Sequence, residues 1–414
     1  MRHRLPRSPA RRSLNNSRRR IAVITPYLPH SEIPHAGGRY LHKLTETLID
    51  LGAQVDFFAP EWTNESALKE LPSSRVHATR LSESRSWLAR LNRRVLGGAD
   101  RRIKLFEPTA VPMTHFPIAP RLEHLNILRK ADVIDLQWPE YAHLAPLVRS
   151  LNPKCLLICT PHDVLSQRVG RAVAAEDTEQ NRRHLRRAAK LEAKMVSQAD
   201  EVVVFSQKDA ALLGAINGRA RLRVIDPPMP LIRASNNASS HHGNKVVFVG
   251  LLSRPENFEG VNWFLRNVWP LIRAERPTTT FEIVGTGLPH EIHAKWLQQT
   301  GVVLRGYVSD LNLVYSEAAV AVAPLFTGAG VKFKSLEAIV SGLPIVATEI
   351  GAEGIPHEWF LGVTEEPSTF AQSVLAGLVG GTEVDDLTLR AMEQARRVHH
   401  EDRFVDTVRE LYMT

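Results

Sequence analysis

The sequence predicts an α/β protein with two domains, each containing a parallel β-sheet that helices cover on both faces. Three observations support this fold class. The chain has 414 residues, which is enough for two large domains. Apolar strand-like segments alternate with helical ones in two blocks, 20–228 and 245–390. Between them, residues 229–244 are rich in turn-forming residues and poor in large apolar ones, as expected of a linker.

The first block begins with a short apolar strand at Arg20–Thr25, which a helix follows at about Arg39–Leu51. The segment Val76–Pro120 shows no clear pattern. A long, heavily charged helix is predicted at Asn181–Ala199. The other predicted strands of this block are Gln54–Ala59, Ala131–Gln137, Lys154–Thr160, Glu201–Ser206 and Arg223–Asp226.

The second block alternates more regularly, which is typical of βαβ units. A further helical stretch at about Asp386–Tyr412 closes the chain, and we assign 391–414 to a C-terminal helix. The predicted strands are Lys245–Gly250, Thr280–Val284, Val302–Gly306, Ala319–Ala323 and Pro344–Ala347. The predicted helices are about Gly260–Arg273, Pro289–Gln298, Leu311–Ser316 and Lys332–Ser341.

The net charge of +8 comes largely from the N-terminus. Residues 1–19 are rich in arginine, lack acidic residues and have no apolar signal-peptide core, which predicts a disordered basic tail. Other basic residues gather at Arg85–Lys104 and Arg182–Lys194. Such surfaces can serve anionic lipid, nucleic acid or solubility alone. A nucleic-acid-binding protein is therefore one hypothesis, but the chain has no recognition motif to support it.

The composition also bears on cellular location. No apolar stretch approaches the ~20 residues that a membrane-spanning helix needs. Cys155 and Cys159 lie on one predicted strand, where an i,i+4 pair is too far apart for a disulfide. This use of cysteine fits a reducing compartment. We expect a cytoplasmic protein, whose basic segments would allow a peripheral position on the inner face of an anionic membrane.

The most informative segment is 327–348. A small-residue loop ending at Gly330 opens a helix that lies between two apolar strands. Lys332, Lys334 and Glu337 thus fall at the carboxyl edge of a sheet, where open α/β sheets bind ligands. Backbone N–H groups at a helix start favour an anion there, and Glu337 can accept hydrogen bonds from hydroxyls. The segment predicts a site for a phosphate-bearing, hydroxyl-rich ligand such as a nucleotide sugar.

The two lysines constrain this site. On a regular helix, Lys332 and Lys334 would point about 200° apart and could not both face one phosphate. Either the helix begins after Lys332, or only one lysine binds. The apolar neighbours Val331 and Phe333 favour a loop or first-turn position for Lys332.

Two features of the first block lie at a similar edge. Gly37-Gly38 either lets backbone approach a phosphate or sugar, or forms an ordinary strand-to-helix turn. His162 directly follows an apolar strand, where it could orient a hydroxyl, transfer a proton or simply lie in a surface loop. The pair His241-His242 lies in the linker without further ligands, so we predict no metal site.

These motifs carry a resemblance to a known family. The second block resembles the nucleotide-sugar site of retaining glycosyltransferases with the GT-B fold, and most of all the group called family 4, or glycosyl transferases group 1. The resemblance implies two Rossmann-like domains facing each other across a cleft, with the C-terminal helix crossing back to the first domain. Its motifs are Gly328-Ala-Gly330-Val-Lys-Phe-Lys-Ser-Leu-Glu337-Ala, Gly342-Leu-Pro-Ile-Val-Ala-Thr348, Gly351-Ala-Glu-Gly354, Gly37-Gly38 and His162-Asp163-Val.

The resemblance implies two catalytic residues. Lys332, with the helix start near Gly330, would neutralise the diphosphate leaving group, and Lys334 would belong to the same donor site. His162 would contact the transferred sugar near its reacting carbon.

The resemblance implies donor-binding roles for other residues. Glu337 would hold the ribose hydroxyls. Gly37 and Gly38 would approach the phosphates from the opposite domain. Tyr307 and Val308 would line the base.

Two departures from the family pattern matter. Many members carry two glutamates, whereas here the first position is Ala329, which leaves the identity of the sugar open. Many also carry an Arg and a Lys after the first strand of the second domain. Arg254 is the candidate here, at a different spacing and with no lysine after it.

We therefore expect a glycosyltransferase that moves a sugar from a nucleoside-diphosphate sugar to a hydroxyl of a glycan or lipid-linked acceptor. The resemblance implies retention of configuration and a role in polysaccharide or cell-envelope glycan synthesis. We expect no cofactor and no metal, and we expect an anionic membrane surface, but no nucleic acid, among the partners. The alternative is a nucleotide-sugar epimerase of the same fold.

Overall fold

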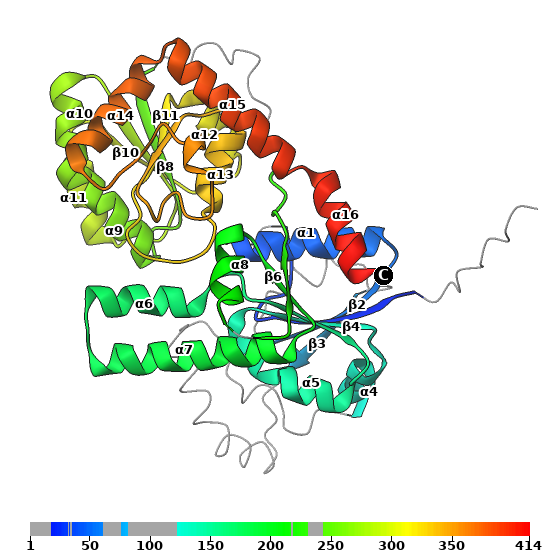
Figure 1. Cartoon of the computed structure of the whole chain (residues 1–414). Helices are drawn as coiled ribbons and strands as arrows, with labels where there is room; N and C mark the ends of the chain where they lie inside the picture. Colours follow the sequence, from blue (N-terminus) through cyan, green and yellow to red (C-terminus); the bar gives the residue numbers. More distant parts are fainter. Residues whose placement is uncertain are drawn as a thin grey trace, which may run out of the picture.

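The computed structural model describes residues 18–60 apart from 32 and 34, 76–81, 122–230 apart from 217, and 243–414. These residues form two lobes, with the N-terminal lobe below the C-terminal one in Figure 1. Most of the predicted basic tail, Arg85–Lys104 and His241-His242 lie outside the described residues. The predicted domain boundaries remain predictions.

Within the described residues, the N-terminal lobe has a seven-stranded parallel sheet in the order β3-β2-β1-β4-β5-β6-β7. Its strands are β1 (Arg20–Ile24), β2 (Gln54–Pro60), β3 (Val76–Leu81), β4 (Val133–Gln137), β5 (Leu156–Thr160), β6 (Glu201–Val204) and β7 (Arg221–Val224). Its helices are α1 (Ala36–Asp50), α4 (Leu122–Lys130), α5 (Ala145–Leu151), α6 (Leu165–Ala175), α7 (Glu179–Gln198) and α8 (Gln207–Gly214), with a 3-10 turn at Pro139–Leu144.

The described C-terminal residues 243–414 contain a six-stranded parallel sheet in the order β10-β9-β8-β11-β12-β13. Its strands are β8 (Lys245–Val249), β9 (Thr280–Val284), β10 (Val302–Gly306), β11 (Val320–Ala323), β12 (Ile345–Ala347) and β13 (Gly362–Val363). Its helices are α9 (Pro255–Trp263), which continues through a π-helical turn (Phe264–Val268) into α10 (Trp269–Glu275), then α11 (His290–Leu297), α12 (Leu311–Glu317), α13 (Phe333–Val340) and α14 (Pro367–Val379).

Apolar side chains cover both faces of each sheet. Successive residues of a strand point to opposite faces. Ile24 therefore packs in one cluster with Met195 of α7, whereas Val23 packs in another with Leu41 of α1. This arrangement confirms the predicted α/β fold class with two parallel sheets. Cys155 and Cys159 are buried and free, as predicted.

The C-terminal stretch crosses from one lobe to the other (Figure 1). The prediction of a single helix over 391–414 was wrong, because α15 (Thr382–Val398) and α16 (Glu401–Tyr412) are separate helices. Helix α15 packs on the C-terminal core through Ala395, whereas α16 packs on the N-terminal core through Phe404 and Tyr412. The break lets the chain change direction between the two cores.

The two connections between the lobes lie side by side. The carbonyl of His399, between α15 and α16, accepts a hydrogen bond from the Met229 N–H at 3.2 Å. The Nδ1 atom of His399 lies 2.8 Å from the carbonyl oxygen of Pro227. Any hinge movement of the lobes must therefore turn about this shared junction.

None of the described helices is both long and apolar enough to cross a membrane.

Candidate active site

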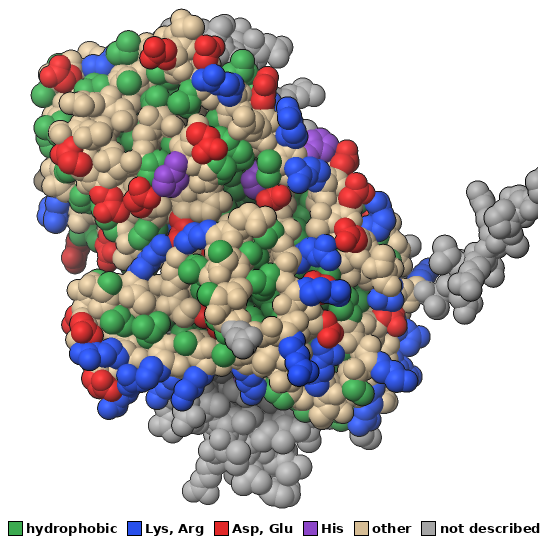
Figure 2. Space-filling model, in the orientation of Figure 1, with side chains coloured by type: hydrophobic (Ala, Val, Ile, Leu, Met, Phe, Trp, Pro, Cys, Tyr) green, Lys and Arg blue, Asp and Glu red, His purple; other side chains and the backbone are tan. Residues whose placement is uncertain are grey.

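The strand orders locate the ligand-binding edge of each lobe. In both sheets the strand order reverses beside the first strand, between β1 and β4 in one lobe and between β8 and β11 in the other. Ligands of open α/β sheets bind in the crevice outside the carboxyl ends of the strands at such a switch point. The residues that follow these strands contact one another across the lobes, and Figure 2 shows the groove between them.

Helix α13 begins at Phe333, so Lys332 is its N-cap and not a regular helical residue. The helix therefore starts after Lys332, which was one of the two alternatives. The Lys332 ammonium donates to the carbonyls of Gly330 at 2.7 Å and Ala329 at 3.1 Å. It also lies 3.2 Å from Glu353. Burial, with the nearby Arg171 charge, lowers the pKa of Lys332 to about 7.

Glu353 joins the two lobes electrostatically. Its carboxylate accepts two hydrogen bonds from Arg171 of α6, at 2.5 and 2.9 Å, and contacts Lys208 of α8 as well as Lys332. Glu353 itself is only 5% exposed. Three cations, two of them from the opposite lobe, thus share one carboxylate, and we call Lys332, Arg171, Lys208 and Glu353 the Lys332 cluster.

Two further carboxylates, those of Asp163 and Asp209, lie near this cluster. Asp163 lies near but pairs with Arg168 at 3.6 Å. Burial raises the pKa of Asp209 on α8, while its hydrogen bond with Ser206 and the charges of Lys208 and Lys332 oppose that shift. Burial also lowers the pKa of Lys208 to about 8. Within the cluster itself, three basic side chains face a single carboxylate.

Lys334 points into its own lobe. Its ammonium donates to the side-chain oxygen of Asn257 and lies 4.7 Å from the centre of the Phe248 ring. A Cβ on Gly250, just after β8, would lie 3.0 Å from it. Burial lowers the pKa of Lys334 to about 7. A lysine of α13 thus occupies the loop after the first strand of this lobe, where family members with the usual pattern carry their basic residues.

Glu337 is buried in α13 and faces the opposite lobe. Its Oε1 atom lies 2.5 Å from the guanidinium of Arg39 in α1, and the Tyr315 hydroxyl lies 3.5 Å from Oε2. Arg39 follows Gly37 and Gly38 directly in sequence, so this ion pair links the first turn of α1 to Glu337.

His162 and Gly330 meet between the lobes. A Cβ on Gly330 would lie 3.1 Å from the His162 carbonyl oxygen, and the φ of Gly330 is 72°. A Cβ on Gly37 would lie 2.8 Å from Nδ1 of His162. Position 330 suits glycine because of its positive φ, and Gly37 leaves room for the His162 ring. Gly37, His162 and Gly330 therefore form one group, which Lys332 joins through its hydrogen bond to the Gly330 carbonyl.

The His162 side chain is held among aromatic rings. It stacks on Trp138 with ring centres 3.9 Å apart, and Tyr40 and Phe205 contact it edge-on. Burial lowers the pKa of His162 to about 3, so the ring is neutral at pH 7. Trp138 and His162 are the two non-glycine residues with positive φ among those that the structure describes. Such strained conformations cluster at functional sites.

Three predicted site residues lie apart from this group. Arg254 is half exposed and pairs with Glu256 at 3.5 Å, although its charge is close enough to affect Lys334. Tyr307 is 74% exposed, whereas Val308 packs on the core beneath it. These three residues border the carboxyl edge of the second sheet. Among the residues that the structure describes, none of the three forms a hydrogen bond or ion pair with the Lys332 cluster.

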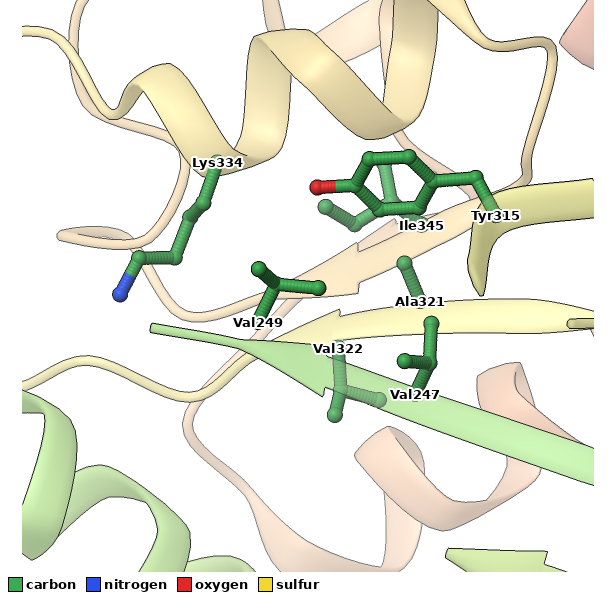
Figure 3. Close-up of a pocket in the computed structure, with 7 residues that line it drawn as sticks. All are labelled: Val247, Val249, Tyr315, Ala321, Val322, Lys334 and Ile345. Atoms are coloured by element: carbon green, nitrogen blue, oxygen red, sulfur yellow. The ribbon is translucent and has the colours of Figure 1, made fainter. Parts of the chain in front are cut away.

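A small hollow lies beneath α13 (Figure 3). Valine, alanine and isoleucine side chains of β8, β11 and β12 line most of it, with Tyr315 and Lys334 as its polar members. In Figure 3 the Lys334 amine points away from the Tyr315 ring. An apolar hollow of this kind suits neither phosphates nor sugar hydroxyls, so the polar groove between the lobes is the better candidate.

The sequence prediction missed several residues of the site, some of which carried a signal. Arg39 had a signal, because it follows the glycine pair at a helix start. Glu353 lies within the motif Gly351-Ala-Glu-Gly354, but nothing in the sequence was a reason to assign it a role. Arg171 and Lys208 look like ordinary solvated helix residues in the sequence. The described residues contain no group of three His, Cys, Asp or Glu side chains that could hold a metal ion.

Two family models match the chain. Residues 243–378 match the model described as "Glycosyl transferases group 1", and residues 36–228 match the "Glycosyl transferase 4-like domain". Together they span both lobes and include the Lys332 cluster, Gly37 and His162. The chain is a glycosyltransferase with the GT-B fold.

Part of the chain also matches an individual protein. The glycosyltransferase is 29% identical over 143 residues to an uncharacterised 44.6 kDa protein in the cps region of Klebsiella pneumoniae. That match covers 32% of this chain and 37% of the relative's length.

Solved structures share the fold of the glycosyltransferase along nearly its whole length. Sucrose-phosphate synthase from Thermosynechococcus elongatus has a TM-score of 0.71 at 19% identity, covering 96% of this chain and 98% of that one. HepE from Anabaena, solved with UDP and glucose, has a TM-score of 0.65 at 14% identity, with 95% and 98% covered. S. aureus TarM, solved as a variant with UDP, has a TM-score of 0.65 at 9% identity, with 95% and 100% covered.

Proposed function

We propose that this glycosyltransferase takes a sugar from a nucleoside-diphosphate sugar and transfers it, with retention of configuration, to a hydroxyl of a glycan or lipid-linked acceptor. The observation that carries the proposal is the Lys332 cluster. Lys332, Arg171 and Lys208 converge on one carboxylate at the edge where two Rossmann-like sheets face each other. Such a surplus of positive charge suits a diphosphate.

The chemistry depends on the leaving group. In the transfer, the bond between the anomeric carbon and the β-phosphate oxygen breaks, and the phosphate keeps the electron pair. The acceptor oxygen bonds to the anomeric carbon, and its proton passes to the departing phosphate. Preorganised cations near the departing phosphate stabilise its growing charge, which is usually the largest contribution to such catalysis. We propose that Lys332 contributes most, with Arg171 and Lys208, so that no metal or cofactor is needed.

The rest of the donor has proposed partners as well. Glu337 would accept hydrogen bonds from the ribose hydroxyls, for which Arg39 stands in across the groove. Gly37 and Gly38 would lie near the phosphates, and Tyr307 with Val308 near the base. His162, neutral at pH 7, would contact the transferred sugar without acting as a proton donor.

We propose an anionic membrane surface as a further partner, because the acceptor class includes lipid-linked glycans. A row of basic side chains follows the outer face of α7, along the lower edge of Figure 2. Its exposed members are Arg182, Arg183, Arg186, Lys190 and Lys194. Flotation with phosphatidylserine vesicles at low and high salt tests this proposal. Salt-sensitive binding supports it, and no binding at low salt would exclude it.

Sugar transfer is tested directly by incubation with a panel of nucleoside-diphosphate sugars and glycan acceptors. The proposal predicts release of nucleoside diphosphate that requires an acceptor, and NMR of the product should show the donor's anomeric configuration. Turnover or epimerisation of the donor without any acceptor would instead favour a nucleotide-sugar epimerase of the same fold. A Lys332→Ala variant of unchanged thermal stability should lose most of the transfer rate.

A further inference from the structure

A buried chain of polar groups joins the C-terminal helix to His162. The Tyr412 hydroxyl of α16 donates to Oδ2 of Asp135 at 2.7 Å, and the Gln137 amide nitrogen donates to the same oxygen at 2.6 Å. The Gln137 amide oxygen lies 2.7 Å from Nε2 of His162. Thr160 donates to the other Asp135 oxygen at 3.1 Å. All members except His162 are fully buried.

This arrangement fixes the direction of every hydrogen bond. Burial raises the pKa of Asp135 to about 6, so its carboxyl is mostly ionised at pH 7 and only accepts hydrogen bonds. The Gln137 amide must therefore present its NH₂ group to Asp135. Its oxygen then faces His162 and also only accepts. His162 must therefore carry its proton on Nε2, which leaves Nδ1 as a bare acceptor on the Gly37 side. Nδ1 has no hydrogen-bond partner among the described residues.

We propose that Asp135, Gln137 and Tyr412 are positioning residues that hold His162 in this one tautomer and orientation. The proposal deepens the proposed function, on which it rests, because it names the groups that place His162 against the transferred sugar. It also gives the crossing C-terminal helix a second role beyond closing the N-terminal core.

The surroundings of His162 show why its position needs such support. Its backbone has a φ of 59°, an unfavourable conformation for a residue with a side chain. Trp138 holds one face of the ring, and Gln137 holds one ring nitrogen. These contacts keep the His162 carbonyl opposite Gly330, within the groove. Loss of the Gln137 hydrogen bond would free the ring to rotate and relax the backbone.

The first test is long-range ¹H–¹⁵N NMR of histidine-labelled protein at pH 7, with the His162 signal assigned by its loss in His162→Ala. The proposal predicts a neutral ring protonated on Nε2, and a mixture of tautomers in Gln137→Leu. A wild-type ring protonated on Nδ1, or an unchanged tautomer in Gln137→Leu, would overturn the proposal. Because this readout needs no donor, it does not depend on the proposed function.

The second test is kinetic. Gln137→Leu is expected to lower kcat for sugar transfer about tenfold or more, with a smaller change in the donor KM, because small misplacements of catalytic groups have such effects. Tyr412→Phe should lower kcat by a smaller factor, about threefold. Val408→Ala is the matched control, since Val408 is buried on the same helix but outside the polar chain. It should lower thermal stability while leaving kcat and the tautomer unchanged.

The outcomes separate the two proposals. Equal losses of kcat in all three variants would mean a merely structural role and would overturn the positioning role. The predicted tautomers in a protein that transfers no sugar would contradict the proposed function alone. Sugar transfer with the wrong tautomer would contradict the positioning chain alone.

Discussion

At the scale of single residues, Lys332 and Lys334 make donor binding depend on pH. Burial lowers the pKa of each to about 7 in the unliganded protein. A bound diphosphate favours the charged ammonium, so binding above pH 7 must take up protons. Affinity for a nucleoside diphosphate should therefore fall as pH rises from 7 to 9, by up to about tenfold per pH unit for each lysine.

Calorimetric titrations across this range, in buffers of different ionisation enthalpy, measure both the affinity and the proton uptake. In Lys332→Arg the positive charge persists at all these pH values, so affinity should fall less steeply with pH than in the wild type. An affinity that is constant from pH 7 to 9 in the wild type would show that these lysines do not bind the anion.

Glu353 is expected to compete with the diphosphate for Lys332. In Glu353→Gln the three cations lose their shared carboxylate, so the unliganded protein should melt at a lower temperature and bind a nucleoside diphosphate about tenfold more tightly. Isothermal titration and thermal melts check both effects. Glu349→Gln, an exposed change in the same loop, is the control. Weaker binding in Glu353→Gln would mean that Glu353 supports the donor site.

Glu337 provides a third test at this scale. Glu337→Ala should weaken binding of a nucleoside-diphosphate sugar about tenfold or more, because hydrogen bonds to a charged acceptor are among the stronger ones. The chain should stay folded, because Arg39 is partly exposed and can be hydrated. Calorimetry with the donor and a circular-dichroism melt measure the two effects, with Glu358→Ala as an exposed control. Normal donor binding in Glu337→Ala would refute the ribose assignment.

At the scale of elements, the sequence predicted most of the strands, because central strands of parallel sheets are continuous apolar runs. Val76–Leu81 was missed because an edge strand needs no such run, and Gly362–Val363 is too short to show a pattern. The sequence could not decide whether α13 begins before or after Lys332. The backbone geometry of Lys332, which is the N-cap, shows that the helix begins after it.

The same reasoning explains what the sequence could not show of the site. Motifs and loop positions indicated Gly37, His162, Lys332 and Glu337 because they follow strands. Arg171 and Lys208 lie on α6 and α8, and only the packing of one lobe on the other brings them to Glu353. Asp135 did carry a signal, namely an acidic residue within an apolar strand.

Helix α16 should stabilise the lobe to which it crosses. Phe404 is 2% exposed and packs in the same apolar cluster as α1. Phe404→Ala should lower the free energy of unfolding of the N-terminal lobe by about 3–5 kcal/mol. Arg403→Ala, an exposed neighbour, should change it by less than about 0.5 kcal/mol. Urea unfolding measures both, and equal stability of the two variants would show that α16 is not part of that core.

At the scale of the whole molecule, the groove is one site assembled from two lobes. The C-terminal lobe supplies Lys332, Glu337 and Glu353, and the N-terminal lobe supplies Arg39, Arg171 and His162. Ion pairs already join the lobes across it, while both connecting segments meet at His399. A bound donor would then take the place of Glu353 as the partner of Lys332, and of Arg39 as the partner of Glu337. The lobes need only turn about the junction at His399 to admit the donor.

The central claim is that this groove binds the diphosphate of a nucleotide-sugar donor. It is tested most directly by isothermal titration of the wild-type protein and of Lys332→Ala with a panel of nucleoside-diphosphate sugars. We predict saturable binding of at least one donor to the wild type, and binding at least about tenfold weaker in a folded Lys332→Ala. Binding to neither protein, or equal binding to both, would contradict the claim.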